Sequence, residues 1–223
     1  FETIETAAPR WQLFCAQAGL RGWQIAQHED VRFGCVTIRD WQAYEEYWSG
    51  NHRRNLRKAL KRIDHEGGMQ FVAHVNPATE LVGNLLQTGF EVEHRSWKAD
   101  TGTSVLAVPG KQAYYQRLAE QMSDWGHLHL SLIEHQGWPI AFSLGLMAKG
   151  VYFAPKIGYD DAFSRFSPGQ LLFYELLRSF HEQRLVESVD FWGPLTDATS
   201  KWITHDYARG RLILAPPRGS SRA

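Results

Sequence analysis

The sequence lacks several features that commonly direct a fold or reveal a partner. Only two of its 223 residues are cysteine, Cys15 and Cys35, which gives no disulfide framework and suits a reducing compartment. Lys and Arg together number 24, as do Asp and Glu, so the overall charge indicates no polyanionic partner. No apolar run is as long as a membrane span, and the first residues carry no basic-then-apolar signal. We therefore expect a cytoplasmic protein with no membrane span.

The length and the aromatic content are sufficient for a substantial core. Nine of the residues are Trp, a large amphipathic side chain that suits a cleft as well as a core. The first residue is Phe1 rather than Met, which favours a fragment of a longer protein. In residues 1–39 we expect a helix at Pro9–Ala18 and short strands at Trp23–Gln27 and Phe33–Ile38. This segment is interpreted either as the remnant of a preceding domain or as an N-terminal extension.

Residues 40–215 are predicted to form the main domain, and residues 216–223 a disordered tail. Helices are expected from Asp40 and, after Ser49, along a strongly basic second run. That run contains a band of six basic residues: Arg53, Arg54, Arg57, Lys58, Lys61 and Arg62. The band suits binding of a nucleotide's phosphates or of the acceptor stem of a tRNA. The alternative is a solvated helix face with no ligand.

A strand, two helices and a group of strands are predicted next. The strand covers Met69–Val75; one helix starts at Asn76-Pro77 with a possible interruption at Gly89, and another covers Pro109–Trp125. Strands at Leu128–Glu134 and Pro139–Met147, joined by a tight hairpin at Gln136-Gly137, precede a third strand from Val151 to Lys156. The nearby His127 and His129 lack further ligands at a fixed spacing, so no metal site is predicted.

A helix starting at Pro168 is the clearest element of the sequence. Its apolar residues at helical spacing are expected to face a sheet: Leu172, Phe173, Leu176, Leu177 and Phe180. Ser167 is a favoured N-cap residue, Pro168 suits the first helical position, and Gln170 would complete a capping box. A strand leading into such a helix brings the helix's free N–H groups to the sheet edge, where a phosphate can bind. The alternative is an ordinary capped helix. A strand at Val186–Phe191, a helix at Thr196–Asp206 and a strand at Arg211–Leu214 are predicted to follow.

Several segments in the same order resemble one known family. The segments are Ser49–Arg57, Ser96-Trp-Lys98, Gly137–Ala141, Lys156–Asp160, Phe166–Leu172, Val189–Gly193 and Lys201-Trp202. They are similar to a bacterial acetyltransferase family with the GNAT (GCN5-related N-acetyltransferase) fold, associated with cellulose and exopolysaccharide biosynthesis and related to the Fem peptidyltransferases. The resemblance implies an α/β fold with a mixed central sheet and flanking helices. It also implies a two-domain arrangement, of which a second GNAT-like domain is missing from this chain.

The activity that the resemblance implies is transfer of an acyl group, acetyl in the first instance, from acetyl-CoA or another acyl-CoA to an amine by direct attack. The acceptor would be a small-molecule or saccharide amine, and no metal is needed. Two other functions stay open: an aminoacyl-tRNA-dependent transferase of the Fem type, and a non-catalytic GNAT-like scaffold.

For the acyl-CoA-dependent transferase, three groups of site residues are expected. The catalytic candidates are Asp190 as base with Asp160 as its alternative, and Tyr207 or Tyr159 as the acid for the leaving thiolate. Cofactor binding is assigned to Tyr152, Phe153, Ala154 and Lys156 for the pantetheine and to Arg165, Ser167, Gly169 and Gln170 for the pyrophosphate. Acceptor binding is assigned to Glu93, Arg95, Trp97, Lys98, Trp192 and Lys201.

The predicted phosphate loop departs from the usual GNAT pattern. Arg165 is followed three positions later by Pro168, which has no N–H group to offer, and Gly169 is the glycine that remains. Cofactor binding is accordingly expected to be altered, served by another carrier, or lost.

Overall fold

The computed structural model describes residues 1–2 and 4–217 and divides them between two compact units. Unit 1 consists of Phe1–Cys35 and the segment from Gly193 onward, and unit 2 consists of Val36–Trp192. Residues 218–223 of the predicted tail lie outside the described residues.

Unit 1 pairs the beginning and the end of the chain. Its strands follow the order β1 (Ile4–Glu5), β8 (His205–Ala215), β2 (Gln24–Thr37), and β8 pairs antiparallel with both of its neighbours. The unit also contains helix α1 (Pro9–Leu20). The two short strands predicted near Trp23 and Phe33 are one strand with a register shift between Glu29 and Val31. This irregularity interrupts the alternation of side chains, which explains why the sequence pattern appears as two pieces.

The helix predicted at Thr196–Asp206 is wrong. Residues 196–202 form turns in which the Thr196 and Thr199 side chains bond to each other and to backbone groups, and β8 has already begun at His205. Thr side chains that bond to nearby backbone favour turns over helix. In β8, Asp206 lies opposite Gly34 and pairs with Arg32 (Nη2–Oδ1 2.6 Å), so long-range pairing with β2 decides its conformation.

The sheet of unit 2 is mixed, as predicted. Its strands follow the order β3 (Gln70–Val75), β4 (Leu128–His135), β5 (Trp138–Ala148), β6 (Val151–Tyr159), β7 (Ser188–Pro194). Successive pairs from β3 to β6 are antiparallel, whereas β6 and β7 are parallel. The parallel pair requires a crossover connection, which α7 (Pro168–Gln183) supplies after the short 3-10 helix η1 (Asp161–Phe166).

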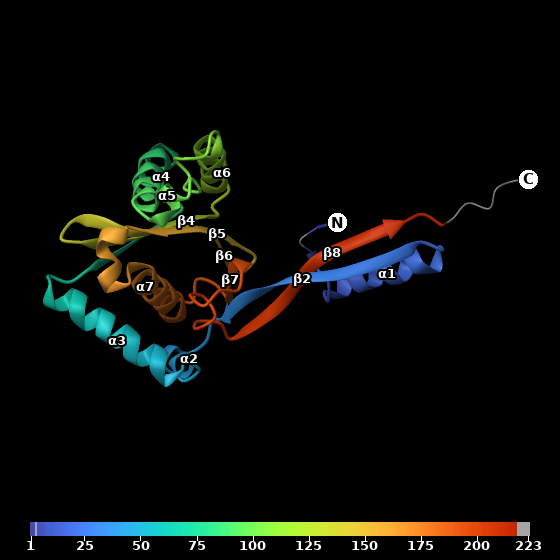
Figure 1. The fold of residues 1–223 in the computed structure, drawn as a ribbon, viewed down its shortest axis with the longest axis horizontal. Coiled ribbons are helices and arrows are strands. Elements are labelled where there is room, and N and C mark those ends of the chain that lie inside the picture. Colours follow the sequence, from blue (N-terminus) through green and yellow to red (C-terminus); the bar gives the residue numbers. More distant parts are fainter. Residues whose placement is uncertain (3, 218–223) are drawn as a thin grey trace, which may run out of the picture. The chain divides into compact units, whose positions relative to one another are not determined.

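Helices cover both faces of this sheet (Figure 1). One face carries α4 (Thr79–His94), α5 (Trp97–Asp100) and α6 (Lys111–Asp124); the other carries α7, with α2 (Trp41–Glu45) and α3 (Gly50–His65) packed against it. The apolar residues predicted to face inward from α7 are all buried: Leu172, Phe173, Leu176, Leu177 and Phe180. The predicted α/β fold with a mixed central sheet and flanking helices is therefore confirmed.

Two local predictions in unit 2 have different outcomes. The hairpin at Gln136-Gly137 is confirmed, since both residues have the positive φ (52° and 76°) that a tight two-residue turn requires. Helix α7 begins at Pro168 as predicted, but Ser167 lies in the left-handed region (φ 57°) and its side chain makes no capping hydrogen bond. The predicted capping box is wrong because this backbone conformation differs from the extended one of a side-chain N-cap.

Gly89 does not interrupt α4, and the structure explains its presence. A Cβ atom at Gly89 would lie 2.3 Å from the ring of Phe142, which is buried on β5. A Cβ atom at Gly83, in the same helix, would meet nothing within 4 Å. The glycine at position 89 is therefore required for the close approach of α4 to the sheet, not for flexibility.

The two glycines should respond oppositely to alanine. We expect Gly83→Ala to raise the free energy of unfolding by about 0.5–1 kcal/mol, the helix preference of alanine over glycine. Gly89→Ala should lower it by about 1–3 kcal/mol, because overpacking against Phe142 outweighs that preference. Urea unfolding of both variants measures the difference. Stabilisation by Gly89→Ala would show that α4 is not packed on β5 in this way.

Candidate functional site

Strand β6 carries a bulge at its centre. Leu144 and Leu146 of β5 are two residues apart but pair with Lys156 and Phe153, which are three apart, so β6 has one extra residue. The extra residue falls at Ala154-Pro155, and proline is tolerated inside a sheet at such a bulge because it has no N–H for the ladder. The bulge shifts the alternation of side chains along the rest of the strand.

The parallel pairing of β6 with β7 ends at the same point. It covers three residues of each strand and stops at Phe153 and Asp190. Beyond the bulge, the N–H group of Asp160 donates to the carbonyl of Ile140 on β5. Hydrogen-bonded and non-bonded pairs alternate along an antiparallel ladder, and Ile157 is three residues before Asp160, so Ile157 is in a non-bonded pair with β5. The C=O of Ile157 therefore points away from β5, towards the side on which β7 lies. We call the segment Ala154–Tyr159 on this side the open edge of β6.

A buried ionic cluster lies against this open edge. The Glu93 side chain at the end of α4 is fully buried, and its Oε1 atom lies 2.7 Å from both Lys98 Nζ and Lys156 Nζ. Its Oε2 atom accepts from the N–H of Val105 at 3.0 Å. Lys98 also donates to the C=O of Ile157 at 2.7 Å. Predicted acceptor residues, Glu93 and Lys98, and a predicted cofactor residue, Lys156, thus form one group.

The surroundings shift the ionisation of this cluster. Burial alone would raise the pKa of Glu93, but hydrogen bonds from Lys156, Lys98 and the backbone of Val105 outweigh it and lower that pKa. Burial lowers the pKa of Lys98, against the attraction of Glu93, and the neighbouring Lys156 and Lys111 act in the same direction as burial. The Glu93 carboxylate is thus stabilised as an anion, and the cluster contains two ammonium groups for this one carboxylate.

Sequence reasoning missed two residues that shape the cluster. A Cβ atom at Gly158 would lie 2.7 Å from the Cβ of Glu93, so this glycine allows α4 to approach β6. The ring of Tyr115 on α6 lies 5.6 Å from Lys156 Nζ, within cation–π range, and burial together with the charge of Glu93 raises the Tyr115 pKa. Gly158 lies within the motif Lys156–Asp160 and could have been found from the sequence, whereas Tyr115 lies in none of the motifs.

Arg95 and Asp160 form a second ion pair beside the cluster. Arg95 Nε lies 2.5 Å from Asp160 Oδ2, and its guanidinium also donates to the C=O of Pro139 and covers the ring of Trp138. The other Asp160 oxygen accepts from the N–H of Ala162 and thereby caps η1. This geometry assigns Asp160 to holding η1 against the sheet.

Trp97 lies next to this pair, at the start of α5. Its backbone N–H donates to Asp161 Oδ2 at 2.5 Å, and its side chain is 51% exposed. The N–H of Asp161 in turn donates to the C=O of Arg95. These bonds tie the residues between α4 and α5 to η1, so the predicted acceptor segment and the predicted phosphate loop are neighbours.

At the N-terminus of α7, one backbone donor is available. The N–H groups of Gln170 and Leu171 both donate to the C=O of Ser167, and Pro168 has none. Among the described residues, no acceptor bonds to the N–H of Gly169. Arg165 pairs with Glu66 (Nη2–Oε2 2.6 Å), and its backbone C=O accepts from Arg62 of α3. Gly169 and Gln170 are both predicted to bind the pyrophosphate, but within the described residues the N–H of Gln170 is already bonded and that of Gly169 is not.

Asp190 and Trp192 terminate the paired part of β7. Asp190 is 6% exposed and its Oδ1 atom accepts from the N–H of Trp192 at 2.7 Å. Trp192 has a positive φ of 44°, which is uncommon for a bulky residue, and its 43% exposed ring packs on Phe153 at 5.4 Å between centroids. Such a conformation is maintained only by its surroundings and is concentrated at functional sites.

The remaining predicted cofactor residues of β6 differ in their exposure. Tyr152 is fully buried, and its hydroxyl bonds with Ser143, so only its backbone is available to a ligand. Ala154 lies at the bulge and is partly exposed. The ring of Tyr159 lies 3.4 Å from where a Cβ of Gly169 would be, which links the end of the open edge to α7; burial, and then Asp161, raise the Tyr159 pKa.

Two predicted residues belong to unit 1. Tyr207 lies on β8, where its hydroxyl accepts from Arg209 and its ring lies near Phe33. Lys201 is exposed in the turn segment before β8. Their roles stay predictions.

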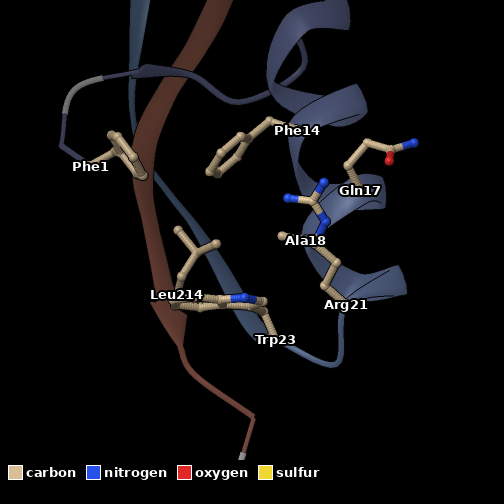
Figure 2. A pocket seen from close by; sticks show the side chains of 7 residues that line it. All are labelled: Phe1, Phe14, Gln17, Ala18, Arg21, Trp23 and Leu214. Atoms are coloured by element: carbon tan, nitrogen blue, oxygen red, sulfur yellow. The ribbon is translucent and has the colours of Figure 1, made fainter.

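A cavity in unit 1 is lined by none of the predicted site residues (Figure 2). It measures about 420 Å³ and is lined chiefly by apolar side chains of the N-terminal segment, α1, the turn before β2 and β8. Figure 2 shows the rings of Phe1, Phe14 and Trp23 with Leu214 around it and the guanidinium of Arg21 beside them.

Within residues 1–2 and 4–217, no three His, Cys, Asp or Glu side chains are grouped as a metal site would require. None of the helices in the same residues combines the length and the apolar character needed to cross a membrane.

The fold is shared with several solved structures at low sequence identity. FemX has a TM-score of 0.67 at 11% identity, covering 95% of this chain and 70% of FemX. L-PGS from Bacillus licheniformis has a TM-score of 0.57 at 14% identity, covering 99% and 68%. A conserved protein from Bacteroides thetaiotaomicron has a TM-score of 0.59 at 10% identity, covering 91% and 67%. The chain thus spans about two thirds of the length of these proteins.

A search of curated protein sequences gave no match. A family model described as the acetyltransferase (GNAT) domain matches residues 50–202, which is more than half of the chain and includes β6, the ionic cluster and α7. The chain therefore belongs to the acetyltransferase (GNAT) domain family.

Proposed function

We propose that this protein is an N-acyltransferase that moves an acyl group, acetyl in the simplest case, from a CoA thioester to an amine. The observation that carries the proposal is the open edge of β6. This edge starts at the bulge and leads to the N–H of Gly169 in α7, which bonds to no acceptor among the described residues. An unpaired strand edge offers N–H and C=O groups to the amides of pantetheine, and a helix N-terminus favours a phosphate. The family membership supports the same activity.

The chain's own residues suit direct transfer. The amine attacks the thioester carbonyl, the C–S bond breaks, and the products are an amide and free CoA. Asp190, at the point where β6 and β7 separate, takes the proton that the amine loses, and Tyr159 supplies a proton to the thiolate. Asp190 is preferred to Asp160 as base because Asp190 lies where β6 and β7 separate, whereas Asp160 forms an ion pair with Arg95. The thioester carbonyl is polarised by backbone N–H groups beside the bulge.

Thermal unfolding in the presence of acetyl-CoA tests this proposal. We expect acetyl-CoA at 100 times its Kd to stabilise the folded chain by about 2.7 kcal/mol, which appears as a rise in Tm. Gly169→Trp should abolish the rise, because an indole would occupy the space beside Tyr159 and the free N–H. Gly50→Trp is the matched control, since Gly50 opens α3 and a Cβ atom there meets nothing within 4 Å. A rise that persists in Gly169→Trp would contradict the proposed site.

An aminoacyl-tRNA-dependent transferase is the second candidate. The basic residues of α3 are exposed along the whole helix, which suits phosphate contacts: Arg53, Arg54, Arg57, Lys58, Lys61 and Arg62. Stabilisation by charged tRNA but not by acetyl-CoA, lost in the triple change of Arg53, Arg54 and Arg57 to Glu, would favour this candidate. If the chain binds neither ligand and has no turnover, it is a scaffold. The acceptor's class, including an amino sugar of exopolysaccharide synthesis, is determined by turnover with a panel of amines.

A further inference from the structure

The ionic cluster of Glu93, Lys98 and Lys156 has more positive than negative charge. Glu93 is its one carboxylate, and both ammonium groups bond to the same oxygen of that carboxylate. Lys111 on α6 also acts on Lys98 as a like charge. Two ammonium groups thus share one carboxylate, with the charge of Lys111 nearby, in partly buried surroundings where an excess charge is less screened than in water.

Lys98 is the member of the cluster that a ligand can reach most easily. Its side chain is 22% exposed, against 11% for Lys156 and none for Glu93. Two of its three N–H groups donate to protein, one to Glu93 and one to the C=O of Ile157. No acceptor among the described residues bonds to the third N–H group, which a ligand can therefore use.

The position of the ammonium is fixed by the packing around it. The C=O of Ile157 faces the open edge of β6, so Lys98 Nζ lies at that edge. Gly158 allows α4 to approach β6 closely, and Val105 donates its N–H to the other oxygen of Glu93. A preorganised cation pays little conformational entropy when a ligand binds.

We propose that this cluster is the subsite for an anionic group, a carboxylate or a phosphate, on the amine acceptor, with Lys98 as the residue that contacts it. The inference rests on the proposed function for the identity of the acceptor. An anion beside Lys98 balances the excess charge of the cluster and accepts the third N–H in a charge-assisted hydrogen bond. A cationic setting of this kind also raises the local concentration of anionic substrates.

Binding of matched small amines to the whole chain tests the inference. The probes are β-alanine against β-alaninamide, and phosphorylethanolamine against ethanolamine, each titrated by NMR at constant ionic strength. The two pairs distinguish a carboxylate from a phosphate as the preferred group. We expect the anionic member of at least one pair to bind about tenfold more tightly than its neutral partner. Lys98→Met should remove that preference, and Lys98→Arg should retain most of it.

The controls separate this inference from the proposed function. Lys149→Met makes the same charge change at an exposed turn position between β5 and β6 and should leave the preference unchanged. Circular dichroism verifies that each variant is folded, and the Tm rise with acetyl-CoA is measured on the same samples. If acetyl-CoA does not raise the Tm but the preference for the anionic amine remains, the proposed function is refuted and the anion subsite is not. Equal binding of both members of each pair, no saturable binding in the millimolar range, or an unchanged preference in Lys98→Met would overturn the inference.

Discussion

Replacement of Glu93 by glutamine is expected to lower the free energy of unfolding by about 3–5 kcal/mol. The carboxylate is fully buried and is bonded to two ammonium groups and one backbone N–H. Glutamine keeps the volume but removes the negative charge, so Lys98 and Lys156 would be left beside each other without a counter-charge. Removal of one partner from a buried ion pair is costly because the remaining charge is not compensated. Urea unfolding at neutral pH measures the loss.

A compensated variant distinguishes charge from packing. When Glu93→Leu is combined with Lys98→Met and Lys156→Met, the cluster contains no charge, and most of the lost stability should return. Glu91→Gln is the control for an exposed carboxylate two residues earlier in α4. A loss of less than about 1 kcal/mol in Glu93→Gln would mean that the lysines find water or another anion, which contradicts the buried geometry.

Acidification should destabilise the protein through His129 by about 3 kcal/mol. Burial lowers the pKa of His129 from 6.5 to about 4, and nearby His74 acts in the same direction. The ring contacts Tyr152 and Phe180, and no hydrogen-bond partner of its buried Nδ1 atom occurs among the residues described. The unfolded chain therefore binds a proton more readily than the folded one. The stability is fully present above pH 6.5 and is lost as the pH falls towards 4.

The comparison of two variants isolates this residue from the carboxylates that titrate in the same range. In His129→Phe, the drop in unfolding free energy between pH 7.5 and pH 4.5 should be smaller than in the unchanged chain by about 2–3 kcal/mol. His65→Phe, at an exposed position near the end of α3, should show the unchanged drop. An identical drop in all three proteins would show that His129 is solvated or hydrogen-bonded. His181, whose pKa burial also lowers, is the same in all three.

Elements with a strong local pattern were predictable. The apolar spacing of α7 identified its buried face, and Pro168 marked its first residue. The β4–β5 hairpin followed from Gln136-Gly137. These predictions succeeded because helix periodicity, a turn residue and a proline act over a few positions. The helix predicted at Thr196–Asp206 failed because pairing with β2, from the other end of the chain, determines that segment.

The site was only partly predictable for the same reason. Glu91 and Glu93 lie two residues apart in one helix, yet one is exposed and the other is fully buried. The sequence assigned Glu93 and Lys98 to acceptor binding and Lys156 to pantetheine binding, without any sign that both ammonium groups bond to one oxygen atom of Glu93. From the sequence, Gly158 is only one residue of a strand; the structure shows that its missing Cβ leaves room for α4.

By itself, the sequence determined the order of most helices and strands, the inner face of α7 and the family, because these depend on neighbouring residues and on a collinear set of motifs. Only the tertiary structure decided where β6 bulges, where β7 leaves it and which charges are buried together. The physical reason is that burial and ion pairing depend on the approach of segments far apart in the chain. That approach is controlled by single atoms, such as the missing Cβ of Gly158.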